Sequence, residues 1–336
     1  MKKLGKVLLY LGIAVVFLLI AAISLTIGWR PFIGPKARSL TSRKFEATPQ
    51  RLERGRYVFE LGGCGECHSQ HVWTKHGAPV IPGTEGGGQW VKMADLPGRV
   101  VAPNLTPDVE TGIGGLSDDQ VARAIREGIG PDGRALFPMM PYEFFRYMSD
   151  EDLASIVVYL RSLPPVRSQL PKTEIIFPVN YLIRSAPKPV TAPVASPDTA
   201  DRLKYGKYLV TIAGCEECHT PKDRGQPVAG FAYAGGWLMR GPWGDVSTAN
   251  ITPDPSGISY YDEALFLEVM RTGYVKAREL NSIMPFGAYK NLTDDDLKAI
   301  FAYLRTVKPV KHRVDNTEPP AYCKLCRQKH GGGDQN

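Results

Sequence analysis

Apolar and polar residues are distributed differently in three parts of the chain. Residues 7–28 contain no charged side chain, and a stretch of 22 residues is long enough for a helix that spans a bilayer. In residues 149–163 and again in 293–307, apolar side chains recur at the spacing of an amphipathic helix. The pattern predicts one membrane-spanning segment followed by two similar helical blocks.

Helix-start signals mark the edges of these blocks. Thr48 stands before Pro49, a pair typical of an N-cap and the first helical position. Ser149 and Thr293 each precede an acidic residue by three positions, as in a capping box. The loops between are rich in glycine and proline, which exclude long helices and central strands, so the predicted fold class is all-α. Shorter helices are expected over residues 118–127 and 262–272.

The two blocks belong to an internal repeat. Residues 55–57 match 206–208, residues 104–108 match 250–254, and residues 140–142 match 284–286, at offsets of 151, 146 and 144. Repeats of about 110 residues suit two ordinary domains. The predicted organisation is a membrane anchor with a basic stalk (1–45), a first domain (46–165), a proline-rich linker (166–198), a second domain (199–310) and a tail (311–336).

Each predicted domain contains the motif Cys-x-x-Cys-His. Its members are Cys64, Cys67 and His68 in the first domain and Cys215, Cys218 and His219 in the second. Two thiols at this spacing can each form a thioether with one vinyl group of a haem, and the histidine that follows is then held against the iron. A zinc site usually needs a second ligand pair, and a redox disulfide motif needs no histidine. The doubled motif therefore predicts two covalently attached haem c groups.

The order of these features resembles the class I cytochrome c family. A helix leading to the haem motif, a loop-rich middle, a late Met-Pro and a closing amphipathic helix occur in both halves of the chain. The strings NLTPDVETGIGGLSDDQ and MPYEFFRYMSDEDLASIVVYLRSLPPV are similar to the multihaem cytochrome c subunits of membrane-bound periplasmic dehydrogenases. The alcohol dehydrogenase subunit of that kind has three haem motifs, whereas this chain has two, which leaves the partner open.

The resemblance implies a methionine as the second axial ligand of each iron. A thioether sulfur raises the reduction potential because it stabilises ferrous iron relative to ferric iron. Met139 and Met140 compete for this role in the first domain. Met140 aligns with Met284, whereas Met139 aligns with Ile283, which cannot bind iron. Met140 and Met284 are the predicted ligands.

Other repeated residues are assigned supporting roles. Gly55 and Gly206 are expected to let the first and last helices of each domain cross closely. The tyrosines expected to pack at these crossings are Tyr57, Tyr159, Tyr208 and Tyr303. Hydrogen bonds to haem propionates and capping of loops are both open for Trp90, Arg99, Asn104, Thr106, Trp237, Asn250 and Thr252.

The amino-terminal segment predicts the compartment. Lys2, Lys3 and Lys6 precede the apolar stretch, and positive residues favour the cytoplasmic side. A signal peptide would have a shorter apolar core and a small-residue cleavage site, for which residues 22–24 are a weak match. We therefore expect a single-pass anchor in a bacterial inner membrane with the haem domains on the periplasmic side, where thiols can oxidise.

The formal net charge of +7 does not indicate binding to nucleic acid. Residues 1–44 hold eight Lys or Arg and no acid, whereas residues 45–307 hold 27 Lys or Arg against 31 Asp or Glu, a net charge of −4. The basic side chains of the stalk are equally compatible with contact to anionic lipid headgroups and with exposure to water. The predicted partners are the membrane and redox proteins such as a periplasmic dehydrogenase, a quinol-oxidising complex or a terminal oxidase.

The tail carries a third Cys-x-x-Cys pair. Arg327 stands where the haem motif has histidine, so a third haem is not expected. A disulfide between Cys323 and Cys326 is the first interpretation in an oxidising compartment. A metal site of Cys323, Cys326 and His330 with a fourth ligand such as His312 is the second, and free thiols are the third.

These features predict a membrane-anchored dihaem cytochrome c that transfers single electrons between a respiratory or dehydrogenase donor and a downstream acceptor, without catalytic residues of its own. The alternative is a dihaem enzyme of the peroxidase kind, which needs one iron open to substrate. A haem subunit of a larger respiratory complex is a further alternative. The two Met-Pro segments are alike, and this similarity favours the electron carrier.

Overall fold

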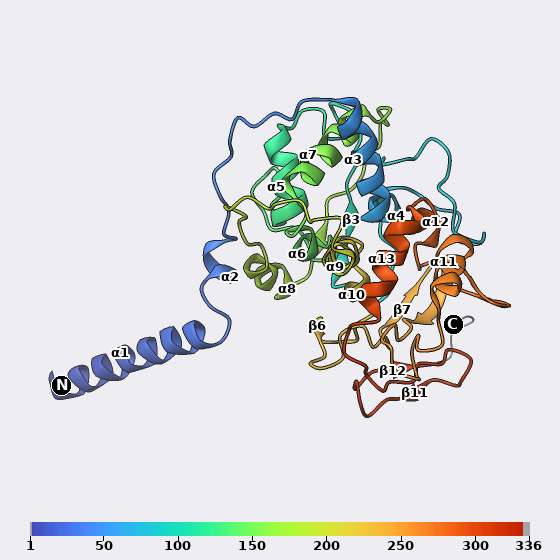
Figure 1. The fold of residues 1–336 in the computed structure, drawn as a ribbon. Coiled ribbons are helices and arrows are strands. Elements are labelled where there is room, and N and C mark those ends of the chain that lie inside the picture. The colour runs from blue at the N-terminus through green and yellow to red at the C-terminus, as the bar shows by residue number, and fades with distance from the viewer. Residues whose placement is uncertain (1, 332–336) are drawn as a thin grey trace.

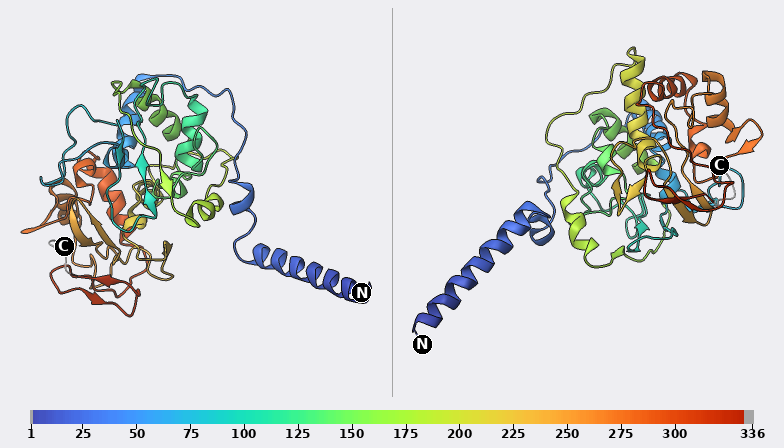
Figure 2. Two further views of the ribbon diagram at one scale, coloured as in Figure 1. Left: turned by 180° about the vertical axis from the view of Figure 1, so that it is seen from behind. Right: turned by 90° about the horizontal axis from the view of Figure 1, so that it is seen from below.

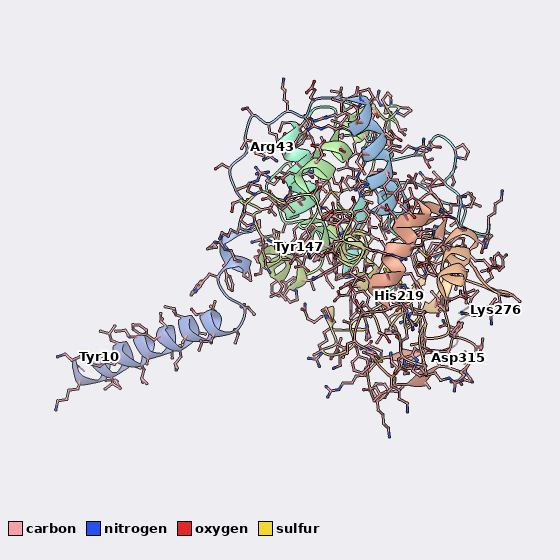
Figure 3. All side chains as sticks on the ribbon, viewed as in Figure 1. Tyr10, Arg43, Tyr147, His219, Lys276 and Asp315 are labelled. Atoms are coloured by element: carbon pink, nitrogen blue, oxygen red, sulfur yellow. The ribbon has the colours of Figure 1, made fainter. Side chains whose placement is uncertain are left out.

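The computed structural model, which describes residues 2–331, consists of a protruding helix and a helical body (Figure 1). Helix α1 (Lys2–Leu25) stands apart from the body in every view (Figure 2), and Tyr10 lies on it far from the body (Figure 3). Among the described residues, α1 is the one helix long and apolar enough to cross a membrane, with a mean hydropathy of 2.8. A signal sequence near the amino terminus can meet the same criterion of length and hydropathy.

The body contains two units with the same order of helices. The first unit comprises α3 (Pro49–Leu61), α4 (Cys64–His68), α5 (Asp118–Glu127), α6 (Tyr142–Phe145) and α7 (Asp150–Ser162). The second unit comprises α9 (Arg202–Ile212), α10 (Cys215–Cys218), α11 (Glu263–Thr272), α12 (Phe286–Tyr289) and α13 (Asp294–Leu304). Outside the units lie α2 (Arg30–Ile33), α8 (Val179–Leu182) and the 3₁₀ helix η1 (Ile183–Ser185).

Strands contribute little to the described part of the chain. They are two to four residues long and form antiparallel pairs. The pairs are β1 (Gln89–Trp90) with β3 (Val101–Ala102), β2 (Gly98–Arg99) with β4 (Glu174–Ile175), β5 (Lys222–Asp223) with β6 (Gln226–Pro227), β7 (Leu238–Gly241) with β8 (Gly244–Ser247), β9 (Tyr274–Val275) with β10 (Arg278–Glu279), and β11 (Ala321–Tyr322) with β12 (Lys329–His330). The predicted all-α fold class is confirmed.

The first and last helices of each unit cross where the sequence places a glycine. A Cβ on Gly55 would lie 2.0 Å from the Ser155 carbonyl oxygen, and a Cβ on Gly206 would lie 2.0 Å from the Ala299 carbonyl oxygen. Only glycine permits this approach, so the predicted close crossing is confirmed. The predicted start of α3 is also confirmed, because the Thr48 hydroxyl accepts a hydrogen bond from the Arg51 N–H at 3.2 Å.

One apolar core runs through both units. Val58 and Leu61 of α3, Leu209 of α9 and Leu297 of α13 are all fully buried and belong to the same cluster. Figure 1 shows α3 lying beside α12 and α13 of the second unit, in agreement with the contact between α3 and α12. The two units are therefore packed together rather than joined only by a linker.

The stalk and the linker pack against the first unit. Arg38 forms ion pairs of 2.7 Å with both Asp119 and Glu127, and the Asp119 side chain is fully buried. The Arg184 guanidinium in the linker donates to the Pro31 carbonyl oxygen at 3.0 Å. Arg38, for which the sequence left contact with lipid and exposure to water both open, instead forms ion pairs with the first unit. These pairs fix the place where the segment after α1 meets the body.

Candidate haem sites

A left-handed glycine sets each haem motif at an angle to the helix before it. Gly63 separates α3 from α4 with a φ of 58°, and Gly214 separates α9 from α10 with a φ of 66°. This backbone region strongly favours glycine. The glycine before the first cysteine of each motif therefore allows the short cysteine-bearing helix to turn away from the long helix before it.

Both motif histidines are oriented by a backbone carbonyl. His68 Nδ1 lies 2.7 Å from the Pro103 oxygen, and His219 Nδ1 lies 2.7 Å from the Ala249 oxygen. Since a carbonyl can only accept, each Nδ1 carries the proton and each Nε2 keeps its lone pair for a metal. Burial lowers the pKa of both imidazoles below the ordinary value, which favours the neutral ring that binds metal.

The repeated Asn-x-Thr motif holds these carbonyl groups in place. The Asn104 side-chain oxygen accepts from the Thr106 N–H at 2.9 Å, and its amide donates to the Val166 oxygen at 2.6 Å. Asn250 makes the matching bonds to Thr252 and Val310, both at 2.9 Å. Of the two roles left open for these asparagines, the structure shows loop capping. The signal available in the sequence was that Pro103 and Ala249 both directly precede the repeated asparagine.

The two Met-Pro segments have the same local geometry. Pro141 and Pro285 precede α6 and α12 with ψ angles of 47° and 45°. The methionines before them, Met140 and Met284, are half-buried against the apolar core in both units. This equivalence agrees with the alignment that paired the two methionines.

A cavity of about 750 Å³ opens at the second motif and reaches the first. Its lining includes Cys215, Cys218, His219 and Met284 from the second unit and Gly63, Cys67 and Met139 from the first. The remaining wall is largely apolar, with Trp237, Val246, Ile300 and Leu304 among its residues. This volume lies within the range of about 300–1,000 Å³ that is usual for ligand and cofactor sites. The residues of the second unit therefore fit a haem.

Met139 lines this cavity, but its position does not make it a ligand. Its repeat counterpart Ile283 lines the same cavity. Both residues of this repeated position therefore lie on the cavity wall, and isoleucine cannot bind iron, so a place on the wall is no sign of a ligand. His68 and Met140 of the first unit do not line this cavity. The cavity therefore brings together the predicted ligands of the second unit, His219 and Met284, but not those of the first.

Tyr57 and Tyr208 connect the two units, which differs from the role expected for them. The Tyr57 hydroxyl donates to Asp296 and accepts from the Thr293 N–H at 3.1 Å, so it caps α13 of the other unit. The Tyr208 hydroxyl donates to Asp152 at 2.5 Å and accepts from the Ser149 N–H at 3.1 Å. Burial raises the pKa of both phenols, which keeps them protonated as donors. Each unit therefore caps the closing helix of the other.

Removal of either hydroxyl should weaken the contact between the units. We expect Tyr57→Phe and Tyr208→Phe to lower the free energy of unfolding by about 1–3 kcal/mol each, because a buried carboxylate loses a donor. Tyr57→Phe should cost more, since Asp152 keeps an ion pair with Arg54 at 2.6 Å. Urea unfolding followed by haem absorbance measures the change.

The matched control for this experiment is Tyr147→Phe. The Tyr147 side chain is 59% exposed and lies on the surface of the first unit (Figure 3). Its substitution should leave the unfolding midpoint unchanged. Equal stability of all three variants would show that the reciprocal caps contribute nothing to the association of the units.

Two helical units, each presenting a Cys-x-x-Cys-His turn with its histidine aimed by a carbonyl, define a tandem haem protein of the c type. The sequence model of the family described as Cytochrome c matches residues 52–164 and 203–308. The chain therefore belongs to the cytochrome c family. With one attachment motif in each matched region, it carries two covalent haem c groups.

Curated relatives are cytochrome subunits of dehydrogenases and a dihaem cytochrome. The chain is 30% identical to the fructose dehydrogenase cytochrome subunit of Gluconobacter japonicus over 84% of its own length and 58% of the relative. It is 28% identical to the cytochrome c subunit of the quinone-dependent alcohol dehydrogenase of Gluconobacter oxydans over 79% of its length and 56% of the relative. A diheme cytochrome c-type protein of Cereibacter sphaeroides is 29% identical over 80% of the chain and 89% of the relative. The chain thus spans little over half the length of these two dehydrogenase subunits.

Proposed function

We propose that this protein is a membrane-anchored dihaem cytochrome c that passes single electrons from a periplasmic dehydrogenase to a respiratory acceptor. In this proposal residues 46–165 and 199–310 are the haem domains, residues 166–198 the linker and residues 311–336 the tail. The observation that carries it is the cavity that joins the two haem motifs, with Cys67 of one and Cys218 of the other in its lining. Electrons can then pass between the haems inside one packed body.

The chain's own residues would bind and orient the two groups. Cys64 and Cys67 would hold the first haem and Cys215 and Cys218 the second, each by adding a thiol S–H across a vinyl double bond. His68 and His219 would bind iron through Nε2, since Nδ1 is occupied by a carbonyl. Met140 and Met284 would each supply the second protein ligand of an iron. Haem supplies reversible one-electron chemistry at iron, and an iron that holds both protein ligands has no site left for a substrate.

The donor and acceptor are proposed from the relatives. The fructose and alcohol relatives are named as cytochrome subunits of dehydrogenases, which supports a dehydrogenase donor. Affinity purification of the tagged full chain from native membranes, with identification of the proteins that remain bound, tests this point. Recovery of a dehydrogenase that reduces both haems supports the proposal. Recovery of the chain alone, with no dehydrogenase able to reduce it, contradicts it.

The membrane anchor and its orientation are part of the same proposal. The lysines in the first turns of α1 and the exposed apolar surface of the helix support a retained anchor with its amino terminus in the cytoplasm. We expect the intact protein to sediment with membranes and to be released by detergent but not by high salt. A variant that starts at Trp29 behind a cleavable leader should be released without detergent.

Mass spectrometry of the mature chain provides the decisive measurement for the anchor. A retained anchor gives a mass that includes residues 2–25. A mature chain that starts near Leu25 would show that the helix is a cleaved signal, while export of the haem domains would still hold.

A further inference from the structure

Four metal-binding side chains converge in the tail, outside both haem sites. They are His312, Cys323, Cys326 and His330, and their ligand atoms all lie within 4.8 Å of one another. We call these four residues the tail cluster. The structure has both cysteines as free thiols, so the disulfide that the sequence favoured is not formed in it. Asp315, which follows His312 by three residues, is labelled in Figure 3 and marks this part of the chain.

We infer that the tail cluster binds one structural zinc ion. Two thiolates and two imidazoles form a closed tetrahedral set, which selects zinc among the common metals. The Cys323 sulfur lies 3.6 Å from His312 Nε2. Zinc bonds of about 2.3 Å to sulfur and 2.0–2.1 Å to nitrogen at a tetrahedral angle give a sulfur-to-nitrogen distance of roughly 3.6 Å.

Each histidine of the tail cluster has a ring nitrogen that no hydrogen bond to the backbone occupies. His312 is 1% exposed, and its Nδ1 lies 2.8 Å from the Ala234 carbonyl oxygen. That bond places the proton on Nδ1 and leaves Nε2 free to coordinate, as a carbonyl partner commonly does for zinc histidines. Nε2 of His330 is buried and has no hydrogen-bond partner. A buried nitrogen without a partner is costly, and a metal ion would satisfy it.

The backbone of the tail brings the cysteines to the histidines. Strands β11 and β12 pair so that Ala321 lies opposite His330. The turn between them is closed by hydrogen bonds of 2.9 Å from the Cys323 N–H to Gln328 and from the Arg327 N–H to Cys323. Cys326 is fully buried within this turn. A short hairpin with two cysteines at its turn is therefore folded onto His312, which lies before the hairpin in the chain.

The tail cluster is built against the loop that supports the second haem histidine. A Cβ on Gly236 would lie 2.6 Å from the His312 ring, so the imidazole packs directly on this glycine. The Gly235 N–H donates to the His219 carbonyl oxygen at 2.7 Å. Residues 234–236 thus lie between the tail cluster and His219. Zinc would fasten the tail over this loop and fix the position of the second haem ligand.

The internal repeat shows that this site belongs to the second unit alone. In the second unit the His312 N–H donates to Ser256 at 2.9 Å, and in the first unit the Ser168 N–H donates to Thr111 at 3.0 Å. His312 and Ser168 therefore occupy the same place in the two units. Serine at this place is compatible with the fold, which makes His312→Ser a variant that should remove a ligand without disturbing the backbone.

Metal analysis of the full chain tests the inference. The protein is purified in detergent from cells grown with zinc, and zinc and iron are measured by mass spectrometry. We expect one zinc for every two irons, and X-ray absorption at zinc should give two sulfur and two nitrogen ligands. His312→Ser and Cys326→Ser should lower the zinc content about tenfold or more with iron unchanged. Leu325→Ser, at a 59% exposed position between the cysteines, should keep the zinc.

A second measurement tests whether the tail cluster affects the reduction potential of the second haem. His312→Ser should shift the midpoint potential of one haem and leave the other unchanged, because the tail cluster packs on the loop that contacts His219. This result depends on His219 as the proposed iron ligand, whereas the zinc content does not. Wild-type protein with less than about a tenth of a zinc per two irons would overturn the inference, whether its cysteines form a disulfide or react fully with an alkylating reagent.

Discussion

Met284→Ala is expected to open the second haem to carbon monoxide and to lower its reduction potential on the order of 0.1 V, within the range of about 0.8 V that axial ligands cover. Met284 lines the same cavity as His219, and alanine is too short to reach an iron held there. Loss of the thioether removes the ligand that stabilises ferrous iron. Spectroelectrochemical titration and carbon monoxide difference spectra of the reduced protein measure the two effects.

The equivalent change in the first unit should act on the other haem. Met140→Ala is expected to lower the potential of the first haem and to make it bind carbon monoxide. Met139→Ala is the matched control, because Met139 occupies the place of Ile283 and should affect neither haem. If Met139→Ala instead opens the first haem, the alignment of the two Met-Pro segments has selected the wrong neighbour.

The unaltered protein decides between an electron carrier and an enzyme. If methionine closes both irons, as we propose, the reduced wild type should bind no carbon monoxide, and it should not turn over peroxide. Rapid carbon monoxide binding or peroxide turnover at an enzymatic rate would favour a dihaem enzyme instead, because such an enzyme needs one open iron.

Replacing both cysteines of one motif should remove half of the haem. Cys215→Ala with Cys218→Ala is expected to reduce the covalent haem from two per chain to one, as measured by the pyridine haemochrome assay. The second unit should also become sensitive to protease, because its apolar wall, including Ile300 and Leu304, surrounds the cavity that the haem would fill. Empty apolar cavities destabilise a fold in proportion to their volume.

The tail cysteines provide the control for this experiment. Cys323→Ala with Cys326→Ala should retain two haems per chain, because Arg327 replaces the motif histidine there. Wild-type protein with one or three haems per chain would contradict the assignment of the motifs. Cys64→Ala with Cys67→Ala should give the reciprocal loss from the first unit.

Local patterns in the sequence were sufficient for the longer helices of the two units and for the haem motifs, but not for the short helices such as α6 and α12. Thr48 and Pro49 predict the start of α3, and the amphipathic spacing after Ser149 predicts α7, because caps and helical periodicity depend only on neighbouring residues. The Cys-x-x-Cys-His spacing is local as well, so it predicts the number and type of cofactor. Repetition then pairs Met140 with Met284 without knowledge of the fold.

Contacts between distant residues were decided only by the tertiary structure. Tyr57 was expected to pack within its own unit, yet its hydroxyl caps α13, more than two hundred residues away. The acceptors for His68 and His219 are backbone carbonyl groups, which carry no side-chain signal in a sequence. The Tyr57 contact depends on how the two units pack together, and the histidine contacts depend on how a loop folds back within each unit. No rule of local spacing determines either.

The interpretation of the tail depends on both the local sequence and the tertiary structure. The sequence by itself determined that Cys323 and Cys326 cannot hold a third haem, because the histidine of the motif is missing. It left a disulfide and a metal site both open, since two cysteines three positions apart suit either. The folded chain brings His312 and His330 to the same point as both sulfurs. A metal site needs four ligands converging in space, and only the packing of the hairpin against the second unit produces that convergence.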